Sequence, residues 1–145
     1  MENPSTDFAR PTRAAGPPDT PLRLPEDCRL ARAAGVNLLV VTSGAANKAL
    51  AELLVAEVAQ PIISWRPGEP LTLPQPAQAR TLILHDVGAL PLLEQRHLID
   101  WLERDGGQTQ VVSTTPTSLL PLVQAGAFLA RLYYRLNTVC VNVTA

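Results

Sequence analysis

The sequence has no excess of charge of either sign. Its 12 Lys and Arg residues are nearly balanced by 13 Asp and Glu residues, which gives a formal net charge of −1. Proteins that bind nucleic acid or anionic membranes electrostatically carry a basic patch or stripe. The balance therefore argues against direct DNA binding and favours a protein or a small molecule as the partner.

Long apolar runs are missing as well. No stretch reaches the roughly 20 apolar residues of a membrane-spanning helix. The N-terminus also lacks the basic, apolar and small-residue pattern of a secretion signal. We therefore expect a cytoplasmic protein that makes no contact with a membrane.

Cysteine is scarce. The two cysteines, Cys28 and Cys140, are far apart in the sequence and lie in no metal-ligand or redox spacing. A cytoplasmic chain keeps such thiols reduced. We expect two reduced, partly buried thiols without a functional role, and we predict no metal site.

The first 25 residues differ in composition from the remainder of the chain. They are rich in Pro, Ala, Thr and Ser, and adjacent Pro17 and Pro18 disfavour both helix and sheet. A segment with few large apolar residues cannot build a core of its own. We expect residues 1–25 to form a disordered arm and residues 26–145 to form one domain.

Short apolar segments alternate with helical patterns after residue 26. The predicted strands are Asn37–Thr42, Pro61–Trp65, Thr81–His85, Gln110–Thr114 and Thr138–Val143. The predicted helices are Glu26–Ala34, Ala46–Val58, Leu92–Arg104, Ser118–Val123 and Ala127–Leu136. Strands that alternate with helices form a parallel sheet covered on both faces. The expected fold class is α/β, a three-layer αβα domain around a five-stranded parallel sheet.

Two segments have distinctive patterns. Arg66–Arg80 contains four prolines and is predicted to be a loop, with a short extended piece at Leu71–Leu73. In the helix that follows, apolar spacing predicts one buried face. Its expected members are Leu93, His97, Leu98, Trp101 and Leu102.

The turn after the first strand has part of a phosphate-binding pattern. Such a loop needs glycines, whose backbone N–H groups can point at phosphate oxygens, and a lysine that reaches the outer phosphates. Lys48, the only lysine of the chain, stands at the lysine position. The candidate phosphate contacts are Ser43, Gly44, Ala45, Ala46, Asn47, Lys48 and Ala49. Because Thr42 and Asn47 replace the two framing glycines, an ordinary strand-to-helix turn remains the alternative.

The predicted strand Thr81–His85 ends at His85, and Asp86 follows directly. Nucleotide-driven motors carry two acids at such a strand end, one for magnesium and one for the attacking water. Imidazole is a poor magnesium ligand. Asp86 is one methylene shorter than glutamate, and a carboxylate displaced by about 1.5 Å loses roughly 10²-fold in rate. We expect His85 to be a hydrogen-bonded strand-end side chain and Asp86 to be a vestigial catalytic residue.

Four segments together resemble the AAA+ domain of the sigma-54-dependent transcription activators, from about Val36 to Val143. TSGAANKA, RTLILHDVGALP, STTPTSL and FLARLYYRLNTV occur in the order of that family's GESGTGKE, GTLFLDEIGELP, AATNRDL and FREDLYYRLNVV. LYYRLN at Leu132–Asn137 is the most specific of them. The resemblance implies a P-loop NTPase-like fold, ATP as the cofactor of the family, and sigma-54 as a functional context.

The resemblance also indicates which functional residues of the family are missing from this sequence. The family's nucleotide-sensing asparagine falls at Pro116, and the first of its two trans-acting arginines falls at Leu129. Arg135 retains the second arginine, and leucine cannot replace a guanidinium on transition-state charge. In the family a long insertion between the second and third strands carries the sequence GAFTGA, whereas here only Arg66–Arg80 occupies that interval. With Ala145 as the last residue, we expect no lid subdomain.

These losses predict a sigma-54-interaction-like domain that does not hydrolyse ATP and regulates transcription through protein association. The expected partners are sigma-54 activators or the sigma-54 RNA polymerase, with Tyr134 and the vestigial Arg135 near the subunit-facing surface. Tyr133 or Tyr134 can instead be a core aromatic. The alternative function is a residual ATP-binding protein or weak ATPase that uses the loop around Lys48, with ATP as the one candidate cofactor. A folded product without a partner is a third possibility.

Overall fold

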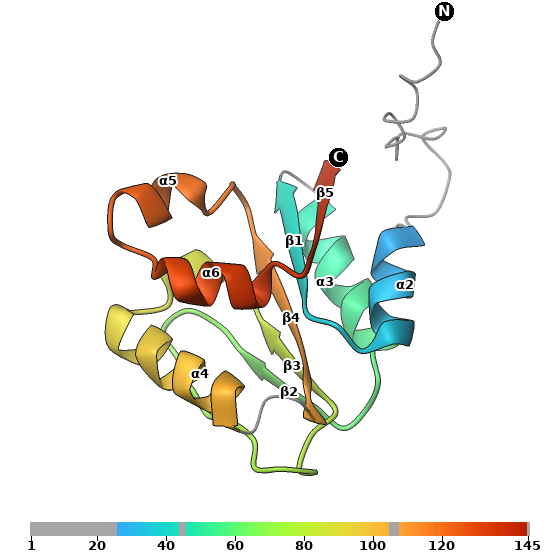
Figure 1. Cartoon of the computed structure of the whole chain (residues 1–145). Coiled ribbons are helices and arrows are strands. Elements are labelled where there is room, and N and C mark those ends of the chain that lie inside the picture. Colours follow the sequence, from blue (N-terminus) through green and yellow to red (C-terminus); the bar gives the residue numbers. More distant parts are fainter. Residues whose placement is uncertain (1–25, 44–45, 105–107, 145) are drawn as a thin grey trace, which may run out of the picture.

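The computed structural model describes residues 26–43, 46–104 and 108–144, so the expected arm over residues 1–25 lies outside the described residues. The strands are β1 (Leu38–Ser43), β2 (Ile62–Trp65), β3 (Thr81–Leu84), β4 (Gln110–Thr115) and β5 (Val139–Thr144). They form one parallel sheet in the order β2-β3-β4-β1-β5. The predicted α/β fold with five parallel strands is confirmed (Figure 1).

Helices cover both faces of this sheet (Figure 1). They are α2 (Glu26–Ala34), α3 (Ala46–Glu57), the 3-10 turn η2 (Val87–Ala89), α4 (Leu92–Arg104), α5 (Leu120–Gln124) and α6 (Ala130–Leu136). Each residue of β3 and β4 is buried, as expected for central strands of a parallel sheet. The result is a three-layer domain with α4 and α6 on one side and α2 and α3 on the other.

The two faces of the sheet carry separate apolar clusters. The α4/α6 face buries Leu39, Trp65, Leu82, Leu84, Val87, Leu90, Leu98, Ile99, Trp101, Leu102, Val111, Leu119, Phe128, Leu132 and Leu136. The α2/α3 face buries Cys28, Ala31, Leu38, Val40, Val58, Ile83, Val112, Val141 and Val143. Successive strand residues alternate between the two clusters because side chains alternate across a sheet.

The helix α2 begins and ends where its sequence predicts. Glu26 and Asp27 lie in its first turn, where negative charge favours a helix N-terminus. Gly35 ends it with a φ of 73°. The N–H of Val36 then donates to the carbonyl of Ala31 at 3.2 Å, which gives a Schellman end. This turn delivers the chain directly into β1.

The buried face of α4 differs in part from the expectation. Leu93 is 64% exposed and His97 is exposed, so neither belongs to the core. Ile99 and the fully buried Gln95 lie on the buried face instead. Leu93 is in the first turn of α4, beyond the edge of the sheet cluster that the rest of the helix covers.

Gln95 connects α4 to the segment before α6. Its Nε2 donates to the carbonyls of Leu90 at 2.8 Å and Ala127 at 3.1 Å, and its Oε1 accepts from the N–H of Leu129 at 2.8 Å. Leu129 has an extended ψ of 128°, so α6 begins at Ala130 rather than at the predicted Ala127. A buried amide with all three bonds made holds the two helices in register.

The loop Arg66–Arg80 packs back onto α4. It forms no strand at Leu71–Leu73, although Leu71 and Leu73 pack against the α4/α6 cluster. The indole N–H of Trp101 donates to the carbonyl of Pro74 at 2.8 Å. The backbone N–H of Leu71 donates to a carboxylate oxygen of Glu94 at 3.3 Å. The short connection between β2 and β3 is thus part of the core layer.

The two thiols have different environments. Cys28, in α2, is buried, whereas Cys140, in β5, is exposed, so the expectation that both are partly buried is wrong. Burial, with a smaller contribution from Asp27, raises the pKa of the Cys28 thiol to about 11. Such a thiol is unreactive at neutral pH.

Neither a membrane-spanning helix nor a cluster of metal-ligating side chains occurs among the described residues. None of the described helices combines the length and the apolar character needed to cross a membrane. Among the described residues, no three His, Cys, Asp or Glu side chains come together as a possible metal site.

Candidate functional site

The strands β1, β3 and β4 end at one edge of the sheet, and a topological switch point lies there. β1 leads into α3 on one face, while β4 leads into α5 and α6 on the other. In open α/β sheets, ligands bind outside the carboxyl ends of the strands at such a point. The sequence places its candidate loop and its His85-Asp86 pair at this edge.

At the end of β3 the two residues of the pair point into different environments. His85 is buried, with 7% of its surface exposed. Asp86 is exposed and adopts a left-handed backbone with φ 52° and ψ 58°, a conformation that Asp tolerates better than most residues. Its N–H donates to the hydroxyl of Thr114 at 3.2 Å. The structure thus buries the imidazole and turns the carboxylate outward.

Three buried polar atoms of the described residues have no hydrogen-bond partner. They are Thr42 Oγ1, His85 Nε2 and Ser113 Oγ. The expectation that His85 is satisfied by hydrogen bonds is therefore wrong for Nε2. Thr42 lies near the carboxyl end of β1, His85 directly follows β3, and Ser113 is the fourth of the six residues of β4. Buried polar groups without a partner indicate strain or function.

Burial lowers the pKa of His85, and the nearby Arg66 lowers it further, while Glu69 opposes the change. Desolvation disfavours the charged imidazolium, and a neighbouring cation does the same. The side chain is therefore neutral at physiological pH. A neutral imidazole at this position supplies neither a carboxylate nor a positive charge.

After β4 the chain turns at Pro116, which is exposed. The hydroxyl of Thr115 donates to the carbonyl of Thr117 at 2.7 Å and closes this turn. Pro116 has no side-chain donor or acceptor. The end of β4 therefore carries a proline ring at the position where the family resemblance places the nucleotide-sensing asparagine.

The candidate phosphate loop is only partly covered by the structure. Gly44 and Ala45 lie outside the described residues, as do the side chains of Ser43, Ala46, Asn47 and Lys48. The backbone of Ser43 ends β1, and that of Ala46–Ala49 opens α3. Thr42 is buried in β1, and of the described non-glycine residues only Ala77 and Asp86 have a positive φ. Thr42 therefore occurs as an ordinary strand residue.

The described donors at this edge do not fit the magnesium ion that phosphoryl transfer requires. Magnesium prefers an octahedral set of oxygen ligands that includes carboxylates. The described donors are the neutral imidazole of His85, the exposed carboxylate of Asp86, and threonine and serine hydroxyls, of which those of Thr114 and Thr115 already form hydrogen bonds. One exposed carboxylate and a nitrogen do not make that set.

The two arginine positions of the resemblance lie on the face of the sheet that α6 covers, with Leu129 directly before α6 and Arg135 within it. Leu129 is partly buried against the α4/α6 cluster. Arg135 Nη2 donates to the carbonyl of Leu102 at 3.0 Å, and its Nη1 lies 3.8 Å from Glu103 Oε2. The retained arginine is thus bound to the end of α4. Glu103 also forms an ion pair with Arg131. Glu103 is not identified from the sequence, although an acid in the last turn of a helix is a candidate partner for the arginines of the next helices.

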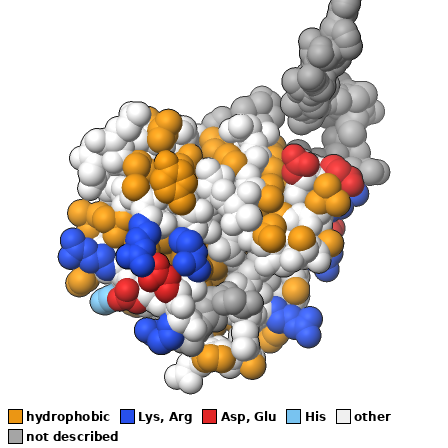
Figure 2. All heavy atoms as spheres, in the orientation of Figure 1, with side chains coloured by type: hydrophobic (Ala, Val, Ile, Leu, Met, Phe, Trp, Pro, Cys, Tyr) orange, Lys and Arg blue, Asp and Glu red, His pale blue; other side chains and the backbone are white. Residues whose placement is uncertain are grey.

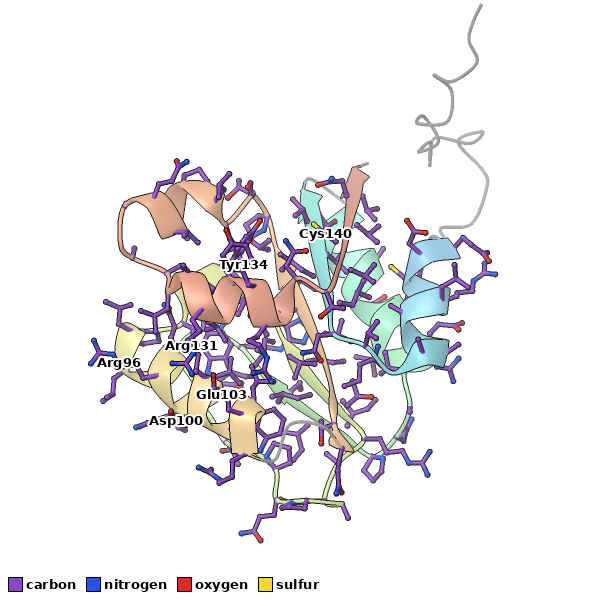
Figure 3. The ribbon with its side chains drawn as sticks, viewed as in Figure 1. Arg96, Asp100, Glu103, Arg131, Tyr134 and Cys140 are labelled. Atoms are coloured by element: carbon purple, nitrogen blue, oxygen red, sulfur yellow. The ribbon has the colours of Figure 1, made fainter. Side chains whose placement is uncertain are left out.

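The two tyrosines of LYYRLN have different roles. Tyr133 is partly buried against the core, whereas Tyr134 is 70% exposed. Their ring centroids lie 5.2 Å apart in an edge-to-face arrangement. Tyr133 is the core aromatic of the pair, and Tyr134 projects from α6 (Figure 3).

Solved structures share this fold. NtrX from Brucella abortus in complex with ADP has a TM-score of 0.63 and 21% sequence identity, over 82% of this chain and 34% of that chain. Its complex with ATP has a TM-score of 0.64 and 18% identity, over 82% and 35%. The P-loop NTPase domain of a sigma-54 transport activator from E. coli has a TM-score of 0.56 and 15% identity, over 81% and 92%. The chain thus spans about a third of NtrX and nearly all of the isolated domain.

No curated protein matches the sequence. A protein family does match, and it covers residues 27–145, which is nearly the whole described region. The all-parallel strand order and the neighbours with a P-loop NTPase fold agree with that match. The chain belongs to the sigma-54 interaction domain family.

Proposed function

We propose that this chain acts in sigma-54-dependent transcription regulation through protein association and does not hydrolyse ATP. The end of β3 carries the proposal. His85 is buried and has a lowered pKa at the position where magnesium-dependent hydrolysis needs a carboxylate. A neutral imidazole gives a hard metal ion no charged oxygen.

Two further positions support the absence of turnover. Pro116 is exposed after β4 and has no amide to contact a terminal phosphate. Leu129 packs against the core and carries no cation for transition-state charge. Arg135, the one arginine that remains at a corresponding position, is bonded to the end of α4 within its own chain.

The surface of α6 supports association. Tyr134 is 70% exposed, and the side chain of Arg131 is 69% exposed. Tyrosine and arginine are the side chains that contribute most strongly at protein interfaces. The partners that we propose are sigma-54 activators or the sigma-54 RNA polymerase, and the compartment that we propose is the cytoplasm.

The proposal is tested by mixing the purified chain with a sigma-54 activator or the polymerase. Size-exclusion chromatography should show a complex, and the chain alone should release no phosphate from ATP. Tyr134→Ala should weaken the complex about tenfold or more. Leu30→Ala, which removes an exposed apolar side chain from α2, should leave the complex unchanged. Absence of any complex, or steady phosphate release by the chain alone, contradicts the proposal.

A second candidate function is nucleotide binding without turnover, or with weak turnover, at the turn around Lys48. The unpaired hydroxyl of Thr42 supports it, because a buried polar atom without a partner at a ligand-bearing edge is unusual. Titration calorimetry with ATP and magnesium should then give heat that Lys48→Ala abolishes. No heat, or equal heat from both proteins, rejects this function.

A further inference from the structure

An open groove lies between α4 and the loop that joins β2 to β3. Its volume is about 310 Å³, and it is lined by Leu71, Leu73, His97, Asp100 and Arg104. The two leucines pack against the α4/α6 cluster, so the loop side of the groove is apolar. The helix side is polar, because its three side chains are all exposed along α4. We call this feature the α4–loop groove.

The loop side of the groove is attached to α4. The N–H of Leu71 donates to a carboxylate oxygen of Glu94 at 3.3 Å, so this N–H faces the helix. Leu71 and Leu73 are partly buried and Thr72 between them is exposed, which is the alternation of an extended backbone. In such a backbone the N–H and C=O of one residue point to the same side, as do those of the residue two positions further on. The carbonyls of Leu71 and Leu73 therefore also face α4.

The hydrogen-bond acceptors of the groove lack partners. Among the described residues, the carboxylate of Asp100 and the carbonyls of Leu71 and Leu73 take part in no hydrogen bond or ion pair. Asp100 projects from α4 at the outer surface (Figure 3). Arg104, the cation of the groove, already has an interaction of its own. The groove thus presents an unpaired negative charge beside two main-chain acceptors.

A large apolar side chain continues the helix side of the groove. Leu93 is 64% exposed, and it shares one face of α4 with His97, Asp100 and Arg104, which follow it by 4, 7 and 11 positions. Figure 2 shows apolar side chains beside charged ones of both signs over α4 and α6. From Leu93 to Asp100 the helix rises about 10 Å. A partner that reaches Asp100 can therefore also cover Leu93.

We propose that the α4–loop groove is the docking site for an arginine side chain of a partner protein. A guanidinium carries five N–H donors in one plane, which suits a carboxylate that lies beside main-chain carbonyls. The methylene stem of the arginine lies on Leu71 and Leu73, because long basic side chains bury their stems on apolar surface. Lysine fits less well, since its ammonium is a compact point charge without the planar fork.

The occupant is a side chain of a protein rather than a free guanidine compound. Sites for small ligands enclose most of the ligand surface, whereas this groove is open, and the exposed Leu93 offers a contact that only a larger partner makes. The partner carries an apolar residue about 10 Å from its arginine, which is three residues away in an extended segment. The site needs neither nucleotide nor sigma-54 and is independent of the proposed function.

NMR titration of the isotope-labelled full chain tests the site with a defined probe. The probe is the peptide acetyl-Leu-Gly-Gly-Arg-amide, whose leucine and arginine have this spacing. The amide signals of Leu73, His97 and Asp100 should shift, with a dissociation constant on the order of 1 mM. Binding should weaken at high salt, because the central contact is ionic. The same peptide with citrulline, a neutral analogue of arginine, should bind about tenfold more weakly.

Substitutions in the chain separate the two contacts. Asp100→Asn removes the charge and should weaken binding of the peptide about tenfold, whereas Glu57→Gln, an acid-to-amide change on exposed α3, should leave it unchanged. Leu93→Ala should weaken binding of the peptide but not of agmatine, which supplies the guanidinium without the leucine. Thermal melting checks that the variants are folded.

Three results would overturn the arginine site. They are unshifted signals from the groove, equal binding of the arginine and citrulline peptides, and an unchanged dissociation constant in folded Asp100→Asn. Agmatine that binds as tightly as the peptide would overturn the assignment of the occupant to a protein.

Discussion

Buried polar side chains behave differently at the two ends of the sheet. At the amino end, the hydroxyls of Thr81 and Thr109 donate to the carbonyls of Ala59 at 2.7 Å and Ala79 at 2.9 Å. Gln110 donates to two further carbonyls. At and near the carboxyl end, the hydroxyls of Thr114 and Thr115 also form hydrogen bonds, but Thr42 Oγ1, His85 Nε2 and Ser113 Oγ have no partner among the described residues. The amino end is built for stability, whereas the carboxyl end holds polar groups that stability does not explain.

The difference fits the position of ligand sites in parallel sheets. The amino end connects helices and strands through side-chain amides, as when Asn37 Nδ2 donates to the carbonyl of Arg135 and its Oδ1 accepts from the N–H of Val111. The carboxyl end is where α/β proteins place their chemistry. In this chain the described donors at that end do not suit magnesium.

Gln95 is the strongest test of the well-bonded region. Gln95→Leu removes three hydrogen bonds, one buried and two part-buried, and takes their partner from two carbonyls and one N–H. We expect a loss of about 3 kcal/mol or more in the free energy of unfolding, measured by urea denaturation. The matched change Gln110→Leu, which loses two bonds, should cost about 1–2 kcal/mol. A loss below that of Gln110→Leu would contradict the role of Gln95 in connecting α4 to the segment before α6.

A threonine pair compares the two ends directly. Thr109→Val removes a buried hydrogen bond and should cost about 1 kcal/mol. Thr42→Val removes a buried hydroxyl that has no partner, so it should be neutral or stabilising. Urea unfolding of both variants beside the wild type measures the contrast. Equal losses for the two variants would remove the distinction between the ends.

The smallest expected effect is a pH dependence that comes from His85. Its pKa is lowered in the folded state by burial and by Arg66. Below the unfolded value of about 6.5, the unfolded chain therefore binds more protons. The contribution of His85 is complete above that pH and is lost as the pH falls through it. His85→Leu should flatten the unfolding free energy between about pH 7.5 and 5.5. An unchanged slope in His85→Leu would contradict the lowered pKa.

The sequence predicts the elements well because their patterns are local. The strand cores at Leu38, Leu82 and Val111 and the helix Leu92–Arg104 follow from apolar runs and helical spacing. The error at Leu93 has a physical cause, since spacing alone does not show where the neighbouring sheet ends. Gln95 is missed because a polar side chain is normally assigned to the surface, and only its distant partners justify its burial.

The site is predicted less completely than the fold. The sequence alone shows that His85 stands where the family has an acid. Its burial and its unpaired nitrogen depend on β2, β4 and the loop with Arg66. The binding of Arg135 to α4 is also a tertiary effect. The phosphate contacts predicted around Lys48 stay a prediction. Motif reading gives the identity of a side chain, while its partners come from segments far away in sequence.

The strand order has a consequence for synthesis on the ribosome. β1 pairs only with β4 and β5, the last two strands to be made. The apolar strand Leu38–Ser43 therefore emerges long before either neighbour exists, and β2 with β3 can pair first. Non-local parallel pairing is slow and leaves nascent strands open to aggregation. Chaperones that shield early-emerging segments should therefore bind this chain at β1.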